Sequence, residues 1–274
     1  MSDAVTAIKT GFIKESFIRT ADHNYLLGRQ GLRLGLVTDG MWLVAHAVEK
    51  YLKATLLLNG RGTKSHSHDI ASLFDEALQI AGEYIPEKFM RIRGGVFVEW
   101  TKRITIREYI SRLNSLGAPE NRYQLFGYNF TTGDVLLVDQ LIYWLRRTSR
   151  TLEKVENLSD PNFWEIDSCL PLERIFRGAD QALAEMLLEG NLIWSLVTSG
   201  GELRRVSIKT SLSIQTSALD ILLNDLKALP ADQRSTTADE LLHWMCKNVR
   251  MSKATEAALK QAVRTITSRS SEAT

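Results

Sequence analysis

One stripe of polar side chains in the N-terminal half has the residue types and spacing of a phosphate- or nucleotide-binding surface. His46, Lys50 and Lys53 recur at helical offsets, with Glu49 between them, so a helix would present them on one face. Ammonium and imidazole groups can hold phosphate oxygens. The alternative is a solvated helix face on which Glu49 and Lys53 form an ion pair at the favourable i, i+4 spacing.

A second group of residues, in the segment 60–68, could carry acid–base chemistry. His66 and His68 can accept or supply a proton, and Arg61 can hold a phosphate as negative charge builds up on it. If the chain cleaves RNA without a metal, the sequence predicts that Arg61, His66 and His68 are the catalytic residues. The alternative is a mobile, Gly-containing loop whose histidines only cap the helix that follows.

The densest basic cluster comes later in the chain. Arg146, Arg147 and Arg150 lie toward the end of a long helical pattern, and Arg122 precedes that pattern. Several arginines on one helix can contact several phosphates and give salt-sensitive binding. The alternative is a helix C-terminus whose cations match the helix dipole and pair with acidic residues elsewhere.

Other chemical motifs are not evident in the sequence. The His, Cys, Asp and Glu residues do not have the spacing of a zinc site, and the glycines match neither a dinucleotide fingerprint nor a P-loop. We therefore expect neither a metal nor a cofactor. Cys169 and Cys246 are far apart, which favours reduced thiols over a disulfide scaffold.

Apolar periodicity predicts the elements that position these residues. The helices expected in the N-terminal half cover residues 22–34, 38–59, 68–82, 110–117 and 134–156. Asp22 and His23 would cap the first helix, and Ser67 or Asp69 the third. Alternating apolar residues over 96–106 are typical of short strands.

The C-terminal part mixes element types. Residues 192–214 alternate apolar and polar side chains around Gly200-Gly201, which predicts a β-hairpin. Thr237 and Glu240 have the spacing of a capping box. The helices expected after the hairpin cover residues 217–229, 237–250 and 253–267.

A turn-rich stretch at 158–162 marks the predicted domain boundary. The fold expected is mainly α, with a helical N-terminal domain over 1–158 and a smaller α+β C-terminal domain over 159–274 that contains the hairpin. Hydrophobic residues make up 44% and charged residues 24% of the chain, the balance of an ordinary globular protein.

Charge and hydropathy limit the partners that the chain can take. The net charge is only +2, so an anionic partner must be held by a local patch. The apolar runs are too short to span a membrane, and the N-terminus lacks the pattern of a signal peptide. We therefore expect a cytoplasmic protein without a membrane partner.

Two short runs in the N-terminal half resemble the signature of the HEPN domain family. The run AHAVEKYLKA at residues 45–54 is similar to the family's A-x-E-K-x-L-K-A run, and His68-Asp69-Ile70 is similar to its His-Asp-Leu. Asn121-Arg122-Tyr123, ahead of the long helix, is similar to some members as well. The resemblance covers about residues 20–157, and residues 160–274 resemble no family that we recognise.

The resemblance implies an antiparallel helical bundle that often dimerises. The family includes toxin components, partners of minimal nucleotidyltransferases and RNA-cleaving defence proteins. Its active members carry an Arg–His pair near the start of the last core helix. Arg122 stands at that place here, but residues 123–128 contain no histidine, so the nearest pairing is Arg61 with His66 or His68.

We therefore expect a HEPN-like protein that binds nucleotide or RNA through a basic surface. A further hypothesis is that it is a ribonuclease of a toxin–antitoxin or phage-defence system. The alternative is a non-catalytic homodimeric scaffold that docks a partner protein. The candidate phosphate-binding residues are His46, Lys50, Lys53, Arg122, Arg146, Arg147 and Arg150.

Overall fold

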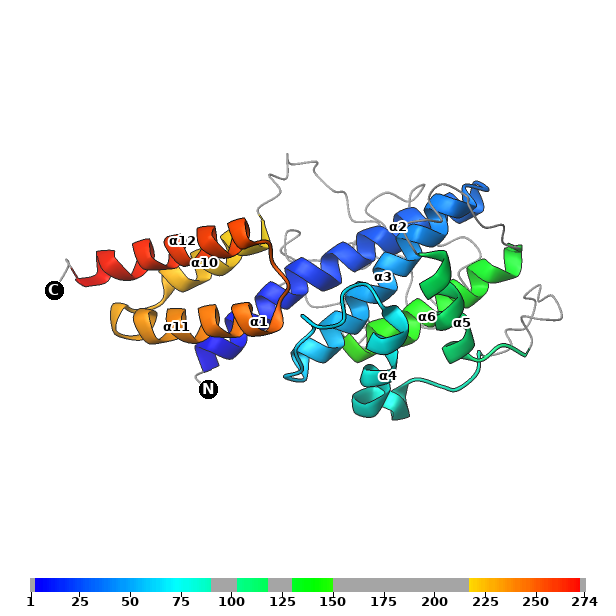
Figure 1. Ribbon diagram of the computed structural model, residues 1–274, viewed down its shortest axis with the longest axis horizontal. Helices are drawn as coiled ribbons and strands as arrows, with labels where there is room; N and C mark the ends of the chain where they lie inside the picture. The colour runs from blue at the N-terminus through cyan, green and yellow to red at the C-terminus, as the bar shows by residue number, and fades with distance from the viewer. Residues whose placement is uncertain (1–2, 90–102, 118–129, 150–216, 272–274) are drawn as a thin grey trace, which may run out of the picture.

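The computed structural model describes residues 3–89, 103–117, 130–149 and 217–271 of the 274-residue chain. The described residues are mostly helical, which confirms the mainly α prediction. Their buried apolar side chains form two hydrophobic cores. Figure 1 shows the corresponding groups of helices next to each other along the long axis of the molecule.

The first core lies among helices of the N-terminal half. These helices are α2 (Arg19–Arg33), α3 (Val37–Leu58), α4 (Ile70–Ala81), α5 (Ile106–Leu116) and α6 (Thr132–Ser149). The short 3-10 turn η2 (Gly82–Tyr84) follows α4. Helix α3 contributes more side chains to this core than any other described helix, because Met41, Val44, Val48 and Leu52 recur at helical spacing and are all buried.

Buried polar contacts give the directions of the three longest helices of this group. Helix α2 turns into α3 within a few residues, and Tyr51 of α3 donates a hydrogen bond to Asp22 of α2. Arg146 of α6 pairs with the same carboxylate, whereas Asp139 of α6 pairs with Arg29, nearer the end of α2. Helix α2 is therefore antiparallel to both α3 and α6, and α3 and α6 run parallel.

The second core joins the N-terminus to the C-terminal helices. Helix α1 (Asp3–Ile13) packs with α10 (Ala218–Ala228), α11 (Ala231–Asn248) and α12 (Lys253–Ser271). Its contribution is Val5, Ile8 and Phe12. The predicted first domain begins at residue 1, whereas these residues pack in the core of the C-terminal helices. The predicted boundary at 158–162 lies outside the described residues.

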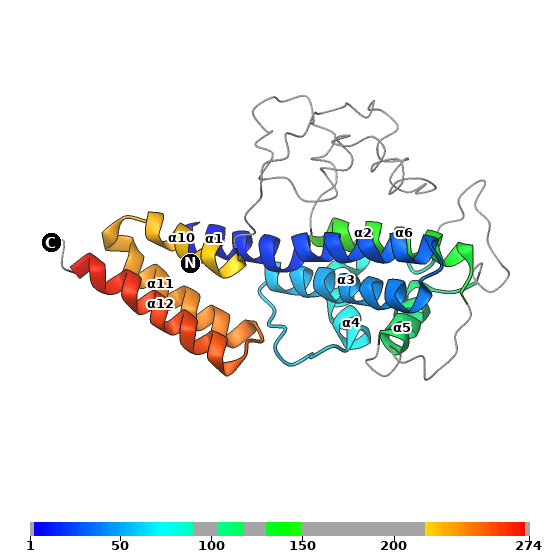
Figure 2. The same ribbon diagram turned by 90° about the horizontal axis from the view of Figure 1, so that it is seen from above.

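A continuous helix connects the two cores. Helices α1 and α2 are joined by the π-helical segment η1 (Lys14–Ile18), and Figure 2 shows the whole helix running through both groups. A π turn adds a residue to the turn and so shifts the apolar stripe around the helix axis. As a result, the apolar face of α1 packs in the second core and that of α2 in the first.

Two predicted helix starts are wrong, and a third is displaced by one residue. The first helix does not begin at Asp22 and His23, because both lie inside the helix that starts at Asp3. Thr237 does not open a helix either, since α11 begins at Ala231 and Thr237 is buried within it. Helix α3 begins at Val37 without a side-chain cap, one residue before the predicted start.

The strands expected over residues 96–106 are absent from the described part of that stretch, residues 103–106. Ile106 begins α5, and Thr105 with Glu108 forms the capping box of this helix. Thr105 also makes an isolated β-bridge to Lys88. Most of the predicted strands and the predicted hairpin at 192–214 lie outside the described residues. Among the described helices, none is both long and apolar enough to cross a membrane.

Candidate functional site

A buried glutamate on α3, Glu49, contacts three of the side chains that the sequence predicts as site residues. Glu49 Oε1 accepts a hydrogen bond from Lys53 Nζ at 2.6 Å. His68 Nδ1 lies 3.2 Å from both carboxylate oxygens, and His46 Nδ1 lies 3.4 Å from Oε2. The Glu49 side chain is only 8% exposed, whereas that of His68 is 73% exposed. Glu49 therefore anchors a partly exposed group of cationic and imidazole side chains.

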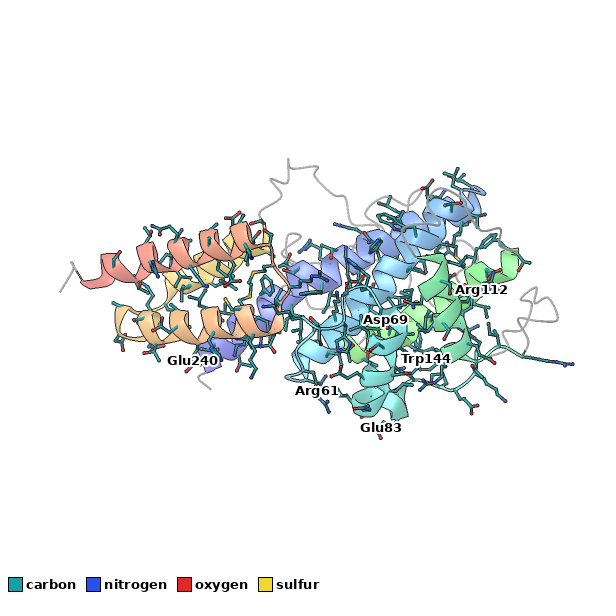
Figure 3. All side chains as sticks on the ribbon, viewed as in Figure 1. Arg61, Asp69, Glu83, Arg112, Trp144 and Glu240 are labelled. Carbon is teal, nitrogen blue, oxygen red and sulfur yellow. The ribbon has the colours of Figure 1, made fainter. Side chains whose placement is uncertain are left out.

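The segment between α3 and α4 brings His68 to this position by running back along α3. Arg61 and Asp69 lie near its two ends (Figure 3). Lys53 Nζ donates to the Ser67 carbonyl oxygen at 2.8 Å, so the end of the segment lies beside the middle of α3. Asp69 then caps α4 by accepting from the backbone N–H groups of its first turn, which confirms one of the two predicted caps.

Because α4 begins beside residues 49–53 rather than at the end of α3, the two helices do not form a simple antiparallel hairpin. The expected proximity of the Glu49–Lys53 segment and the His68-Asp69 pair is nevertheless present. Ser67 has a positive φ of 50°. That conformation is costly for a residue with a side chain and occurs often at functional sites.

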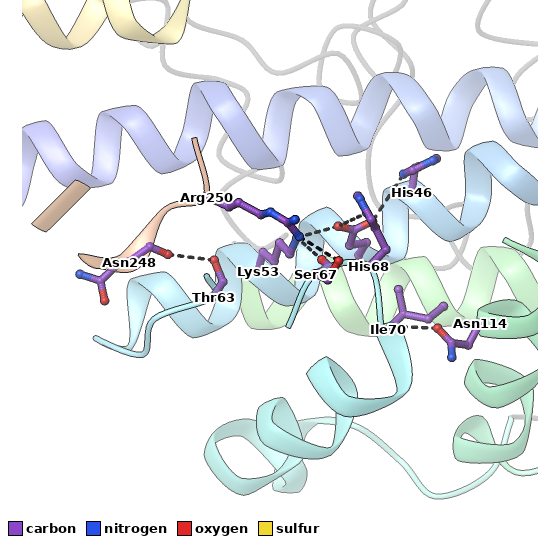
Figure 4. A network of polar contacts seen from close by, with 10 residues as sticks. His46, Lys53, Thr63, Ser67, His68, Ile70, Asn114, Asn248 and Arg250 are labelled. Carbon is purple, nitrogen blue, oxygen red and sulfur yellow. Dashed lines mark hydrogen bonds and ion pairs between the residues drawn. The ribbon is translucent and has the colours of Figure 1, made fainter. Parts of the chain in front are cut away.

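A residue of the C-terminal helices completes the group. Arg250, two residues after the end of α11, donates from Nη1 to Ser67 Oγ at 2.8 Å. Figure 4 shows the Arg250 side chain extending from the C-terminal helices to Ser67, next to Lys53 and His68. We call the group formed by His46, Glu49, Lys53, His68 and Arg250 the junction site, because it lies where the two groups of helices meet.

Further contacts fix the two groups of helices at this place. The Thr63 backbone N–H and hydroxyl both donate to the Asn248 carbonyl oxygen, at 3.1 and 3.2 Å. Lys64 Nζ donates to the Cys246 carbonyl oxygen at 3.0 Å. Both acceptors lie at the C-terminal end of α11, where carbonyl groups lack helical partners. The segment 60–69 therefore connects the first group of helices to the second.

The charges of the site follow from these contacts. Burial opposes ionisation of Glu49, but hydrogen bonds from His46, Lys53 and His68 outweigh it and lower the pKa of this carboxyl to about 2. Glu49 is therefore an anion at any physiological pH. Burial lowers the pKa of Lys50, whose ammonium lies against α2 within reach of the Asn24 side-chain amide. Lys50 and Lys53 are both only partly exposed, the Lys53 side chain to 12%.

The predicted catalytic trio is divided between two carboxylates. His66 Nε2 lies 2.6 Å from Glu76 Oε2, and Arg61 Nη1 lies 3.7 Å from Oε1 of the same residue. His66 Nδ1 contacts Ser72 Oγ at 3.2 Å. Both ring nitrogens of His66 are therefore engaged within the protein. His68 contacts Glu49 instead, so the three residues do not form one constellation.

The structure places one member of the predicted arginine cluster, Arg146, in the core. Arg146 is completely buried and makes two hydrogen bonds to the Asp22 carboxylate, at 3.0 and 3.1 Å. A guanidinium in the core cannot contact phosphate, so Arg146 is removed from the candidate surface. Arg147 packs along the rings of Tyr143 and Trp144 and donates to the Tyr143 hydroxyl at 3.0 Å. Arg122 and Arg150 lie outside the described residues.

Sequence reasoning missed two features of this region. Arg250 has no local signal, because it reaches Ser67 across a separation of 183 positions. The buried ion pairs did have a signal in the sequence, because Asp22 and Arg29 are seven residues apart, as are Asp139 and Arg146. Seven residues are about two helical turns, so an acid and a base on one helix can face a base and an acid at the same spacing on an antiparallel helix.

Neither a metal cluster nor a similar known protein accounts for this geometry. The described residues contain no group of three or more His, Cys, Asp or Glu side chains that could hold a metal ion. Searches with the chain found no matching family model, and no significant match among curated proteins or solved structures. The case for a function therefore depends on the junction site itself.

Proposed function

We propose that this chain binds the phosphate groups of nucleotide or RNA at the junction site. The observation that carries the proposal is the meeting of two cations at one residue. Lys53 from the first group of helices and Arg250 from the second both donate to Ser67, at 2.8 Å each. Glu49 supplies one negative charge against these two cations, so the group carries a local excess of positive charge although the whole chain carries only +2.

The arrangement around Glu49 also supports phosphate binding. A buried carboxylate that holds Lys53 and two imidazoles reduces the conformational entropy that these side chains lose on binding. Arg250 has the planar group suited to phosphate oxygens, and its only hydrogen bond among the described residues goes to Ser67 Oγ. The toxin–antitoxin or phage-defence setting rests only on the resemblance of residues 20–157 to the HEPN family.

The direct test is binding of fluorescently labelled single-stranded RNA, and of ATP, measured over a range of salt concentrations. Wild-type protein should bind with a salt-dependent affinity. Arg250→Gln and Lys53→Gln should each weaken binding and reduce the slope of log K against log salt by about 0.7, the value for one phosphate contact on a single strand. Lys227→Gln, an exposed lysine of α10, is the matched control and should behave as wild type. Absence of binding at low salt, or equal loss in the control, would refute the proposal.

A second candidate function is a scaffold that binds another copy of the chain. The observation that favours it is a set of exposed leucines around the end of α2. Leu27, Leu34 and Leu36 are 62%, 66% and 55% exposed, and apolar groups that gather on a surface often mark an interface. Light scattering over a concentration range tests this candidate. A dimer that Leu34→Glu converts to a monomer supports it, and a wild-type monomer at every concentration contradicts it.

A further inference from the structure

The two cations of the junction site meet at Ser67 without using all of their hydrogen-bond donors. Lys53 donates to Glu49 and to the Ser67 carbonyl oxygen, which leaves the third N–H group of its ammonium for a ligand. Arg250 donates one N–H group to Ser67 Oγ, and the rest of its guanidinium makes no hydrogen bond within the part of the chain that the structure describes. An ammonium and a guanidinium with donors to spare therefore lie beside one residue.

Ser67 and His68 add donors of their own. Ser67 Oγ accepts from Arg250, so the hydrogen of this hydroxyl remains to be donated. The His68 side chain is 73% exposed and uses Nδ1 on Glu49, while its Nε2 makes no hydrogen bond with any described residue. A protonated imidazole donates from both of its nitrogens. Donors from α3, from the segment before α4 and from the chain after α11 thus lie around one place (Figure 4).

This set of donors and charges fits a phosphate monoester better than a phosphodiester. A monoester presents three strong acceptor oxygens and carries about two negative charges at neutral pH. An internal phosphodiester has two such oxygens and one charge, and a chain leaves it on both sides. Lys53 and Arg250 outweigh the charge of Glu49 by one, and a protonated His68 brings the excess to two, the charge of the monoester.

The neighbouring cations do not extend the site along a nucleic-acid backbone. Arg61 lies in the same segment, but its Nη1 is 3.7 Å from Glu76 Oε1. Lys64 donates to the Cys246 carbonyl oxygen, and the ammonium of Lys50 lies against α2. A long backbone is held by several cations that each meet a phosphate, whereas these three are directed to groups of the protein. The described residues therefore form a site for a single phosphate group.

We propose that the junction site binds a terminal phosphate, the monoester of a mononucleotide or of a phosphorylated RNA end, in preference to an internal phosphodiester. The inference rests on the proposed binding of phosphate at this site and adds the class of phosphate. Lys53 and Arg250 hold the anion, the Ser67 hydroxyl donates to a further oxygen, and His68 adds a donor on the exposed side.

The test compares three forms of one internally labelled single-stranded RNA, which carry a 5′-phosphate, a 3′-phosphate or hydroxyl groups at both ends. A phosphorylated form should bind about 10–100-fold more tightly than the form with two hydroxyl ends, the effect of a hydrogen bond to a charged group. In calorimetry, inorganic phosphate and AMP should bind, whereas adenosine and the dinucleotide ApA, which has only a phosphodiester, should not.

The outcomes separate this inference from the proposed function. Preference for a phosphorylated RNA identifies an RNA end as the source of the phosphate, and binding of AMP but of none of the RNAs identifies a mononucleotide. Equal affinity for the three RNAs, with AMP no better bound than adenosine, overturns the inference and leaves binding of phosphate groups standing. Failure of every RNA and nucleotide to bind overturns both.

Variants decide whether the named donors produce the preference. Ser67→Ala removes one donor and the anchor of Arg250, so it should lower the preference for the phosphorylated ligand by about tenfold. Ser65→Ala, in the same segment and likewise exposed, is the matched control and should keep the preference. Arg250→Gln should remove most of it. Ser67 and Arg250 are exposed, so the variants should keep the wild-type melting temperature. A preference that survives in both Ser67→Ala and Arg250→Gln overturns the inference.

Discussion

Replacing Glu49 by Gln should destabilise the protein in a way that depends on pH. The carboxylate holds Lys53 and two histidines, and its side chain is only 8% exposed. Gln has nearly the shape of a protonated Glu but no charge. The difference in unfolding free energy between wild type and Glu49→Gln therefore measures what the ionised carboxylate contributes to the folded state.

The magnitude follows from the pKa of this group. Folding lowers the pKa of Glu49 from its ordinary value of 4.5 to about 2, and each unit corresponds to roughly 1.4 kcal/mol. At pH 7 the ionised carboxylate should therefore stabilise the fold by about 3 kcal/mol. Because the pKa is lowered on folding, this stabilisation is complete above about pH 4.5 and is lost as the pH falls toward 2. At pH 3 about 1 kcal/mol should remain.

Urea unfolding of both proteins at pH 7, 5 and 3, followed by circular dichroism, measures this difference. The matched control is Glu256→Gln on α12, which removes an i, i+4 contact of the same kind, 2.6 Å from Lys260, at the surface. Its effect should be much smaller, because solvent screens an exposed pair. If Glu49→Gln costs no more than the control at pH 7, or if its cost is the same at pH 3, the carboxylate does not anchor the junction site.

Two further predictions concern packing in the first group of helices. Arg146→Met should cost about 3–5 kcal/mol in unfolding free energy, because it leaves the buried Asp22 carboxylate without its cation. Adding Asp22→Asn should recover part of this loss. If the two substitutions have strictly additive effects in urea unfolding, Asp22 and Arg146 are not a coupled pair. Gly40→Ala should lower stability by about 1–3 kcal/mol, because its Cβ would lie 2.8 Å from Leu32 Cγ and 2.9 Å from the Leu32 backbone nitrogen. Gly82→Ala, where an added Cβ meets nothing within 4 Å, should leave the melting temperature nearly unchanged, and equal effects at the two glycines would count against the close approach of α2 and α3.

The elements with strong local periodicity were predictable from the sequence. The apolar stripe of 38–59 gives α3 almost to the residue, and that of 68–82 gives α4, with Asp69 as one of the two predicted caps. Both predictions depend on contacts between residues three and four apart, which the sequence displays directly. Thr237 shows the limit of such reasoning, because a capping-box pattern also occurs inside a helix whose start is set by other contacts.

What the sequence by itself determined is the helical character of the chain and one stripe, His46 to Lys53, with His68 nearby along the chain. Only the tertiary structure decided which polar groups reach the surface. The sequence predicts Asp22 as a helix cap and Arg146 as a phosphate ligand, whereas in the structure the two side chains form an ion pair in the core. A burial that depends on a partner 124 positions away cannot be inferred from local spacing. For the same reason, Arg250 joins the junction site only because α1 packs with the C-terminal helices, which brings the end of α11 against the segment before α4.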